Sequence, residues 1–459
     1  MRITYPKEVD IIFKELRSSG YSRYIVGGCV RDILLGKEPS DWDICTDAKP
    51  EDIQEIFKEY STIPTGLKHG TITVVVNNKN FEITTFRTDK DYIDNRRPRE
   101  VEFTKDIYED LKRRDFTINA LAYNELVGLI DCFNGQRDLD EKIIRTVGNP
   151  NERFNEDALR IIRGVRFSAQ LGFDIEAGTA LAMTNNRELL KNISNERIRE
   201  EFLKIIMTEK PSEGIRRLVS LKLMEYIVPE LIECIGFEQN NSNHDKDVFN
   251  HIMEVLDNTE KDITLRLAAL LHDIGKPQCF TVDENGKGHF YGHHKISAEK
   301  AEEILTRLKF DNKTIDSVRL LVNEHMSRYD FLREKSYKKF INKVGIDNLD
   351  RLFRLQIADI KGSAPPHDFT NIENLKKECT RIINQKEPIT LRDLDINGYD
   401  IMNLGINQGK EIGDILNYLL EVILESPELN KKELLAGLAK QKIQQIDFQQ
   451  KESEDNDSN

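Results

Sequence analysis

The sequence has no stretch of apolar residues long enough to cross a membrane. None of its apolar runs approaches the ~20 residues that a bilayer-spanning helix needs, and residues 1–6 lack the h-region of a signal peptide. With 39% hydrophobic and 32% charged residues, the composition is that of a soluble protein with an ample core. We therefore expect a cytoplasmic protein without a membrane partner.

Cysteine is also scarce, and the spacing of the six cysteines excludes two kinds of protein. No CxxC pair occurs, and 459 residues are too many for a small domain stapled by disulfides. Reduced thiols in a cytoplasm therefore fit better than disulfides or a zinc site. The six residues are Cys29, Cys45, Cys132, Cys234, Cys279 and Cys379.

Basic residues are in deficit, with 67 Lys and Arg against 80 Asp and Glu and a formal net charge of −13. This balance disfavours non-specific binding to nucleic acid. A site for a polyanion must therefore be local, and arginines do cluster over 96–99, 113–114 and 160–166.

The chain is too long for one core, so we expect roughly three or four domains. Strands and helices are mixed over residues 1–148, and helical patterns follow, so the predicted fold class is α+β, with all-α domains after an N-terminal mixed sheet. The predicted helical domains are 149–230, 231–387 and 388–448, and the polar, acidic segment 449–459 is predicted to be disordered.

A glycine pair near the N-terminus predicts a phosphate site. Gly27 and Gly28 follow a short apolar strand over 24–26 and precede a helical pattern that ends before Gly36. Glycine lets the backbone come close to a triphosphate, and Arg31 adds positive charge beside it.

Two carboxylates begin the next strand. Asp41 and Asp43 stand on alternate residues, so they point to one side and can share divalent cations, as a two-metal nucleotidyl transfer requires. Glu82 interrupts the apolar pattern of a predicted hairpin, 71–76 and 81–86. It is either a third acid beside the pair or an exposed strand carboxylate.

A second cluster of functional residue types occupies residues 113–123. If this segment is helical, Asp115 and Asn119 lie at i and i+4 on one face. An acid and an amide together can hold the two hydroxyls of a ribose, and Arg114 can reach a phosphate. The alternative is an ordinary helix with a basic start, which is unusual because arginines oppose the N-terminal dipole.

A third cluster combines acids and arginines over residues 156–167. On a helical wheel Asp157, Arg160 and Arg163 lie along one side, with Arg166 following. The simple interpretation is an i, i+3 salt bridge between Asp157 and Arg160. The functional one is that a carboxylate acceptor beside a guanidinium donor matches cytosine and adenine and mismatches uracil and guanine.

In this order the motifs resemble those of the bacterial class II tRNA nucleotidyltransferases, the CCA-adding enzymes of the polymerase β superfamily. They are Gly-Gly-x-Val-Arg-Asp at 27–32 with the acids 41 and 43, Arg-Arg-Asp-Phe-Thr-Ile-Asn-Ala at 113–120, and Glu-Asp-x-x-Arg-x-x-Arg at 156–163. Segments 195–198, 394–398 and 404–413 are also similar to family sequence, so the resemblance covers most of the chain. Residues 92–98, within an aperiodic stretch (88–103) that we expect to be a mobile loop, resemble the flexible loop of CCA-adding and A-adding members.

The resemblance implies a polymerase β-like head followed by a neck, a body and a tail. It implies CTP and ATP as substrates, tRNA as the acceptor and Mg²⁺ as the cofactor. The implied roles are metal binding by Asp41 and Asp43, with Glu82 as a further catalytic acid; triphosphate binding by Gly27, Gly28, Arg31 and Arg114; ribose binding by Asp115 and Asn119; and base selection by Asp157 and Arg160, with Arg163 and Arg166 nearby.

A second active site is indicated by histidines, seven of the nine falling between residues 244 and 325. His251, the pair His272-Asp273, and Asp359 follow the H…HD…D order of the HD phosphohydrolase family, within about 247–360. Such a ligand set suits Mg²⁺, Mn²⁺ or Ni²⁺ better than tetrahedral Zn²⁺. Further candidates for a second metal or a phosphate contact are His293, His294 and His325. The predicted activity is hydrolysis of phosphoesters such as 2′,3′-cyclic nucleotides or damaged RNA ends; the alternative is a degenerate domain that serves only as a scaffold.

The sequence is also compatible with two other functions. A close relative that adds only A, or a poly(A) polymerase, has overlapping motifs, although the chain lacks the basic C-terminal tail expected of the latter. An RNA-binding HD phosphohydrolase with an inert polymerase-like head is the alternative of another class, and the intact Asp41 and Asp43 disfavour it. Monomer and homodimer are both compatible with the sequence.

Overall fold

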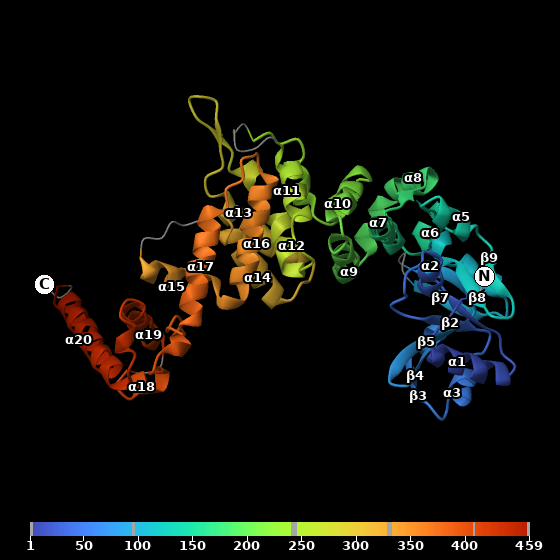
Figure 1. Ribbon diagram of the computed structural model, residues 1–459, viewed down its shortest axis with the longest axis horizontal. Helices are drawn as coiled ribbons and strands as arrows, with labels where there is room; N and C mark the ends of the chain where they lie inside the picture. Colours follow the sequence, from blue (N-terminus) through green and yellow to red (C-terminus); the bar gives the residue numbers. More distant parts are fainter. Residues whose placement is uncertain (1–2, 94–96, 240–245, 328–332, 407–408, 457–459) are drawn as a thin grey trace. The chain divides into compact units, whose positions relative to one another are not determined.

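The computed structural model describes residues 3–93, 97–239, 246–327, 333–406 and 409–456 (Figure 1). The chain divides into two compact units. The first comprises Met1–Glu233 with Ile304–Phe310, and the second comprises Cys234–Glu303 with Asp311–Asn459. Among the described residues, no helix combines the length and apolar character that spanning a membrane requires.

A seven-stranded mixed sheet forms the core of the first unit. Its strand order is β3-β4-β5-β2-β1-β8-β9, and only β2 and β5 run parallel to each other. The bounds are β1 Arg23–Val26, β2 Asp43–Thr46, β3 Ser61–Gly66, β4 Thr71–Val76, β5 Lys79–Thr85, β8 Leu121–Asn124 and β9 Gly128–Asp131. The predicted α+β class with an N-terminal mixed sheet is confirmed.

Short helices flank the strands because each presents one apolar face. In α1 the buried residues Val9, Ile12, Phe13 and Leu16 recur at helical spacing. The others that connect strands are α2 Gly28–Leu34, α3 Pro50–Ile56, α4 Ile107–Lys112 and α5 Gly135–Asp140. Five further helices complete the unit: α6 Pro150–Glu156, α7 Leu159–Leu171, α8 Ala177–Asn185, α9 Asn195–Ile206 and α10 Pro211–Ser220.

Residues 88–93 and 97–103 form paired strands, whereas the aperiodic sequence predicts a mobile loop without strands. Strands β6 (Arg87–Ile93) and β7 (Arg97–Phe103) pair antiparallel as a separate two-stranded sheet. A free-standing ribbon is held by backbone hydrogen bonds and need not bury one face, so its sequence carries no apolar alternation. Residues 94–96, at the centre of the segment that resembles a flexible loop, lie outside the described residues.

Residues 113–123 do not form the helix that was considered for Asp115 and Asn119. Helix α4 ends at Lys112, a 3-10 turn spans Thr117–Asn119, and β8 follows. Pairing of β8 with both β1 and β9 provides hydrogen bonds and burial that a surface helix would lack, so tertiary structure overrides the local pattern.

The second unit is helical. Its helices are α11 Val248–Asp257, α12 Ile263–Leu271, α13 His293–Arg307, α14 Asn312–Glu324, α15 Glu334–Val344, α16 Ile346–Gly362 and α17 Thr370–Asn384, followed by α18 Gly398–Met402, α19 Lys410–Ile423 and α20 Lys432–Asn456. A two-residue ribbon, β12 Thr281–Val282 with β13 Gly288–His289, precedes α13. Helix α20 runs through most of the segment predicted to be disordered, because Gln, Lys and Glu favour helix even without a partner; residues 457–459 lie outside the described residues.

One buried carboxylate anchors the arginines at the end of α4. Asp110 is fully buried and lies 2.7 Å from Arg113 Nη2 and 3.4 Å from Arg114 Nη2. Burial by itself raises the pKa of this carboxyl, but the two guanidinium groups more than offset that and hold it below its usual value. Asp110 therefore stays charged and fixes the direction of Arg114.

We predict that Asp110→Ala lowers the free energy of unfolding of the first unit by about 3 kcal/mol, because removing one partner of a buried ion pair leaves the other charge uncompensated. Trp42, the only tryptophan, lies in this unit, so its fluorescence during urea denaturation reports the transition. Glu109→Ala on the same helix is the control: Glu109 pairs with Lys112 at the surface, and its loss should cost less than about 1 kcal/mol. Equal losses for the two variants would contradict the anchoring role.

Candidate active sites

The acidic residues of the first unit meet where β2 begins. Asp43 is the first residue of β2, and the parallel register of β2 and β5 sets it directly opposite Glu82. Residues in register on neighbouring strands point to the same face of a sheet, so the two carboxylates are neighbours. Asp41 precedes the strand, and its carboxylate accepts a hydrogen bond from Ser40 Oγ at 3.1 Å.

Burial and neighbouring negative charge together raise the pKa of Asp43. Protein atoms displace water from around its carboxylate and raise its pKa to about 6; Arg114 opposes the rise, and the charges of Asp41 and Glu82 add to it. A group of hard oxygen donors whose negative charge is only partly compensated fits a divalent cation such as Mg²⁺.

Gly27 allows the arginine and the acids to approach each other. It has a φ of +74°, and a Cβ at this position would lie 3.0 Å from Arg114 Nη1 and 3.7 Å from Asp43 Oδ2. A side chain here would therefore crowd Arg114 and would strain the backbone, because few other residues adopt this φ. A Cβ on Gly28, the first residue of α2, would lie 3.6 Å from Arg31 Nη2.

The structure brings Asp115 and Asn119 together, although not on a helix. Asn119 Nδ2 donates to Asp115 Oδ1 at 3.3 Å, and Arg31 Nη1 donates to Asn119 Oδ1 at 2.8 Å. The other oxygen of Asp115 accepts from Arg163 Nη2 at 2.6 Å. Burial raises the pKa of Asp115, but Arg163 and Arg160 together lower it to about 2, so the carboxyl is ionised.

Asp157 and Arg160 are not paired with each other, so the simple i, i+3 salt bridge was wrong. Asp157 has extended backbone angles (φ −139°, ψ 104°) between α6 and α7, which breaks the predicted continuous helix. Its carboxylate binds Arg197 Nη2 at 2.9 Å. Arg160 Nη1 binds Glu156 at 2.6 Å, and its Nη2 donates to the carbonyl of Arg113 at 2.9 Å.

The acids Asp43 and Glu82 line the same cleft as Asp115, Asp157 and Arg160, and the volume of this cleft is about 390 Å³. The residues predicted for function that line it are Asp43, Glu82, Arg114, Asp115, Asp157, Arg160 and Arg163. Arg166 is not among them: its Nε lies 3.1 Å from Glu201, and its guanidinium covers the ring of Phe167 at 4.0 Å. Burial lowers the pKa of Arg166 to about 10.

One positioning residue, Glu201, was missed at the level of sequence. Arg197 and Glu201 lie at i and i+4 on α9 and hold Asp157 and Arg166, respectively. Segment 195–198, which contains Arg197, resembles family sequence and is predicted to position other groups rather than to react. The i, i+4 spacing of opposite charges is a recognisable signal, but it does not tell which distant residues the two side chains contact.

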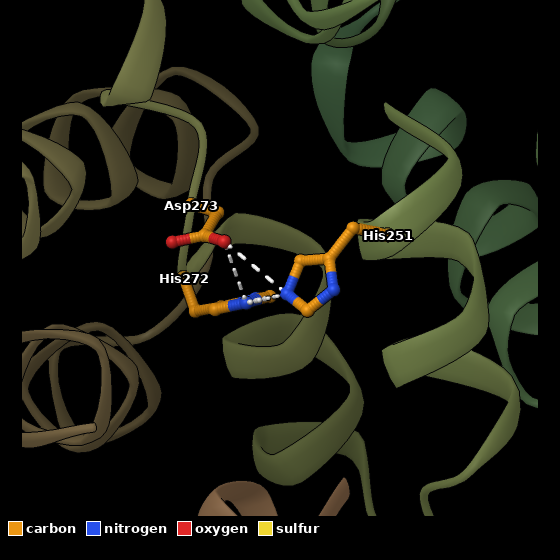
Figure 2. Close-up of side chains that lie close together, drawn as sticks. All are labelled: His251, His272 and Asp273. Carbon is orange, nitrogen blue, oxygen red and sulfur yellow. Dashed lines mark hydrogen bonds and ion pairs between the residues drawn. The ribbon is translucent and has the colours of Figure 1, made fainter. Parts of the chain in front are cut away.

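A separate centre in the second unit contains the histidines. Figure 2 shows the imidazoles of His251 and His272 and the carboxylate of Asp273 converging on one point. Their Nε2 atoms lie 3.3 Å apart, and each lies within 3.3 Å of Asp273 Oδ2. Asp359 Oδ1 is 3.0 Å from His251 Nε2. The structure thus brings together all four residues predicted for this centre.

A second group shares the same aspartate. Asp273, His293 and His325 can also offer three ligand atoms within 4.8 Å of one another. The Nε2 atoms of His293 and His325 are 3.3 Å apart, and they lie 3.3 and 3.8 Å from Asp273 Oδ1. His294 belongs to neither group.

The hydrogen bonds of the four imidazoles fit metal ligands. Each Nδ1 faces a backbone carbonyl: Gly362 at 3.2 Å, Ala269 at 2.8 Å, Phe290 at 2.7 Å and Val322 at 2.6 Å, in the order His251, His272, His293 and His325. Each Nδ1 therefore carries a proton, which leaves Nε2 as the ring nitrogen able to bind a metal, and the Nε2 atoms face one another and the carboxylates. Asp273 Oδ1 accepts no hydrogen bond within the described part of the chain. A divalent cation in each group would fit these nitrogen and oxygen atoms.

The family models that match the chain follow its order of domains. Residues 23–145 match the poly A polymerase head domain, residues 172–235 match the probable RNA and SrmB-binding site of polymerase A, and residues 243–359 match the HD domain.

Curated relatives match along almost the whole chain. The CCA-adding enzyme of Ligilactobacillus salivarius is 34% identical over 445 residues, covering 95% of this chain and 96% of that protein. The CCA-adding enzyme of Streptococcus agalactiae serotype V is also 34% identical, covering 96% and 99%.

Solved structures agree in fold. The CCA-adding enzyme of Bacillus stearothermophilus in complex with CTP superposes with a TM-score of 0.71 at 29% identity, covering 97% of this chain and 100% of that one. The Thermotoga maritima CCA-adding enzyme complexed with tRNA has a TM-score of 0.56 at 22% identity, covering 95% of each, which supports the fold alone.

Proposed function

The chain belongs to the CCA-adding enzymes, and from this membership we propose that it completes the 3′ end of tRNA. It adds C, C and A from CTP and ATP without a nucleic-acid template and releases pyrophosphate at each step. The observation that carries the proposal is the single cleft in which Asp43 and Glu82 face Asp157 and Arg160. One cleft thus combines a cation site with side chains able to select a base.

Asp41, Asp43 and Glu82 would hold Mg²⁺ in this reaction. When bound there, Mg²⁺ lowers the pKa of the attacking hydroxyl and neutralises charge on the departing pyrophosphate. The 3′-oxygen of the tRNA forms a bond to the α-phosphorus, the bond from that phosphorus to the bridging oxygen breaks, and pyrophosphate leaves. Arg114, held by Asp110, and Arg31 bind the triphosphate near the backbone of Gly28, and Asp115 and Asn119 hold the ribose.

Base selection falls to Asp157 and Arg160. A carboxylate acceptor next to a guanidinium donor matches the amino group and ring nitrogen of cytosine or adenine, and it opposes the carbonyl and N–H of uracil or guanine. In the structure both side chains are engaged, Asp157 by Arg197 and Arg160 by Glu156. An incoming base must therefore displace these two ion pairs. Only a base whose hydrogen-bonding edge matches Asp157 and Arg160 compensates for the ion pairs that it displaces. Arg163 acts through Asp115, and Arg166 acts through Glu201 as a positioning residue.

We also propose the acceptor, the domain bounds and the cellular compartment of the chain. The acceptor is the tRNA 3′ end, recognised by the shape of the acceptor stem and elbow rather than by base sequence. We assign the head to 1–148, the neck to 149–230, the body to 231–387 and the tRNA-binding tail to 388–448. All six cysteines are free, which suits a reducing cytoplasm.

A second activity is favoured by a specific observation in the second unit, the two groups of ligand atoms that share Asp273. The proposed reaction is hydrolysis of a phosphoester, in which bound Mg²⁺, Mn²⁺ or Ni²⁺ supplies a nucleophile at neutral pH. Lys276 lies 2.7 Å from Asp273 Oδ2 and lines the same pocket, so it adds positive charge where a phosphate would bind.

CCA addition predicts extension of three tRNA substrates. Transcripts that end at the discriminator base, after C or after CC should all be completed to CCA when labelled CTP and ATP are supplied, as read on a sequencing gel. Omitting ATP should stop the products at CC. Extension of the CC-ended transcript alone would replace this proposal with A addition, runs of A would indicate a poly(A) polymerase, and no extension of any substrate would indicate an inert head.

Arg160→Ala should blur nucleotide choice. A well-placed base contact contributes ~1–3 kcal/mol of discrimination, so the ratio of kcat/KM for CTP over UTP should fall about tenfold or more, while Mg²⁺ binding is spared. Arg153→Ala is a matched control, since Arg153 binds the same Glu156 but does not line the cleft. An unchanged ratio in Arg160→Ala would exclude a role in base selection.

The histidine centre predicts a metal-dependent activity that is separable from CCA addition. His272→Ala and Asp273→Ala should each reduce hydrolysis of a 2′,3′-cyclic nucleotide by on the order of 10²-fold. In the parent protein, a chelator should abolish this hydrolysis, and added Mn²⁺ should restore it. His325→Ala should lower the number of Mn²⁺ ions bound per chain by one, measured by elemental analysis after dialysis. Retained CCA addition establishes that the first unit of each variant is intact, and an unchanged far-UV circular dichroism spectrum establishes that the helical second unit is folded. Full hydrolysis in Asp273→Ala would leave the domain as a scaffold only.

A further inference from the structure

Three arginines of the first unit gather around one aromatic ring, that of Phe167 on α7. The guanidinium carbons of Arg166, Arg31 and Arg163 lie 4.0, 5.3 and 5.4 Å from the centre of this ring. A guanidinium within about 6 Å of a ring centre is attracted by the negative charge on the ring face. Phe167 is only 6% exposed, so water screens this attraction little.

The three arginines come from different parts of the chain, so only the tertiary structure brings them together. Arg31 lies on α2, whereas Arg163 and Arg166 lie on α7 with the ring itself. Each arginine also has a carboxylate partner: Asp32 lies 2.8 Å from Arg31 Nη2, Asp115 lies 2.6 Å from Arg163 Nη2, and Glu201 lies 3.1 Å from Arg166 Nε.

The carboxylates do not cancel the repulsion among the three cations. Burial and the charges of two neighbours, Arg163 and Arg31, lower the pKa of Arg166 to about 10. The carboxylate of Glu201 opposes this shift without overcoming it. The ring of Phe167 therefore contributes what the carboxylates leave out, since it attracts all three guanidinium groups at the place where they crowd one another.

Two of these arginines hold Asp115 and Asn119, the ribose pair proposed above. Arg31 Nη1 donates to Asn119 Oδ1 at 2.8 Å, and Asn119 Nδ2 in turn donates to Asp115 Oδ1 at 3.3 Å. Arg163 Nη2 donates to the other oxygen, Asp115 Oδ2, at 2.6 Å. Both oxygens of Asp115 are thus oriented by contacts that lead back to the ring. Phe167 does not line the cleft, so any effect that it has on the nucleotide passes through these arginines.

A second aromatic ring fixes the direction of the first. The rings of Phe116 and Phe167 meet at 77°, with centroids 5.8 Å apart, which is a favoured edge-to-face arrangement. Phe116 directly follows Asp115, and its amide donates to Asp115 Oδ1 at 2.8 Å. Gly164 on α7 makes room for this contact, because a Cβ there would lie 3.0 Å from Phe116 Cζ. The same segment therefore carries the ribose carboxylate and orients the ring.

We propose that Phe167 is a positioning residue of the nucleotide site. Its ring orients Arg31 and Arg163, and these two arginines in turn hold the ribose pair. The proposal rests on the ribose binding proposed above and adds the residue that orders it. When the attraction at the ring face is weakened, the like-charged arginines separate and the ribose pair loses its alignment, so contact with the 2′-hydroxyl weakens. A ribonucleotide should therefore be affected more than a 2′-deoxyribonucleotide.

The test changes the charge on the ring face while nearly preserving the shape of the ring. Fluorine withdraws electron density, so 4-fluoro-, 3,5-difluoro- and 3,4,5-trifluorophenylalanine in place of Phe167 weaken the attraction for cations stepwise. The measured quantity is the ratio of kcat/KM for CTP over 2′-dCTP, on a tRNA that ends at the discriminator base. We expect this ratio to fall with each step, and about fivefold in the trifluoro protein, which is about 1 kcal/mol. The loss should appear as a higher KM for CTP, with kcat little changed.

The matched control is the same substitution at Phe57. This residue is fully buried in the same unit, its ring contacts Tyr60, and no guanidinium covers it among the residues that the structure describes. Trifluorophenylalanine at Phe57 should leave the ratio unchanged. A second readout needs no turnover: the Kd of CTP without tRNA, measured by calorimetry, should rise about fivefold in the trifluoro protein at Phe167 and should stay at the parent value at Phe57.

Asn119→Ala separates this proposal from the ribose assignment. If Asn119→Ala lowers the ratio but the fluorinated series at Phe167 does not, the positioning role is overturned and the ribose assignment stands. If Asn119→Ala leaves the ratio unchanged, the ribose assignment fails. A stepwise rise in the Kd of CTP along the series then still supports a ring that orients the arginines, and an unchanged Kd overturns it. Equal effects at Phe57 and Phe167 would also overturn it, since they would reflect fluorination of the core alone.

Discussion

The chemistry of the first unit depends on holding three carboxylates close together without letting them neutralise one another. Parallel pairing of β2 and β5 sets Asp43 opposite Glu82, and Asp41 adds a third charge from the preceding residues. Arg114 offsets part of this charge, and its position is set by the buried Asp110. The result is a site with residual negative charge, which suits a divalent cation.

Charge exchange gives a physical account of the proposed choice between bases. Three side chains with a proposed contact to the nucleotide already have a partner: Asp115 has Arg163, Asp157 has Arg197, and Arg160 has Glu156. These partners orient the side chains and leave none of the three charges unpaired. A matching base would replace these hydrogen bonds with equivalent ones, whereas a mismatched base would leave donors facing donors, so the proposed discrimination depends on unpaired groups rather than on shape.

The histidine centre of the second unit is organised by hydrogen bonds to backbone carbonyls. Backbone carbonyls orient four imidazoles so that their Nε2 atoms meet around Asp273, where they could bind cations. Helix packing holds this arrangement in place, because His251 is buried in α11 and His272 and His325 are buried at the C-terminal ends of α12 and α14.

Local patterns in the sequence determined the fold class, the order of the motifs and most of the candidate site residues, because glycine pairs, alternating acids and the H…HD…D order each carry chemistry in their residue types. What only the tertiary structure decided was pairing. That 113–123 contains a turn and a strand, that 88–93 pairs with 97–103, and that Asp157 binds Arg197 instead of Arg160 all depend on residues distant in sequence. Burial and hydrogen bonding to distant partners outweigh local propensity, and no periodicity within a segment records which partner it will meet.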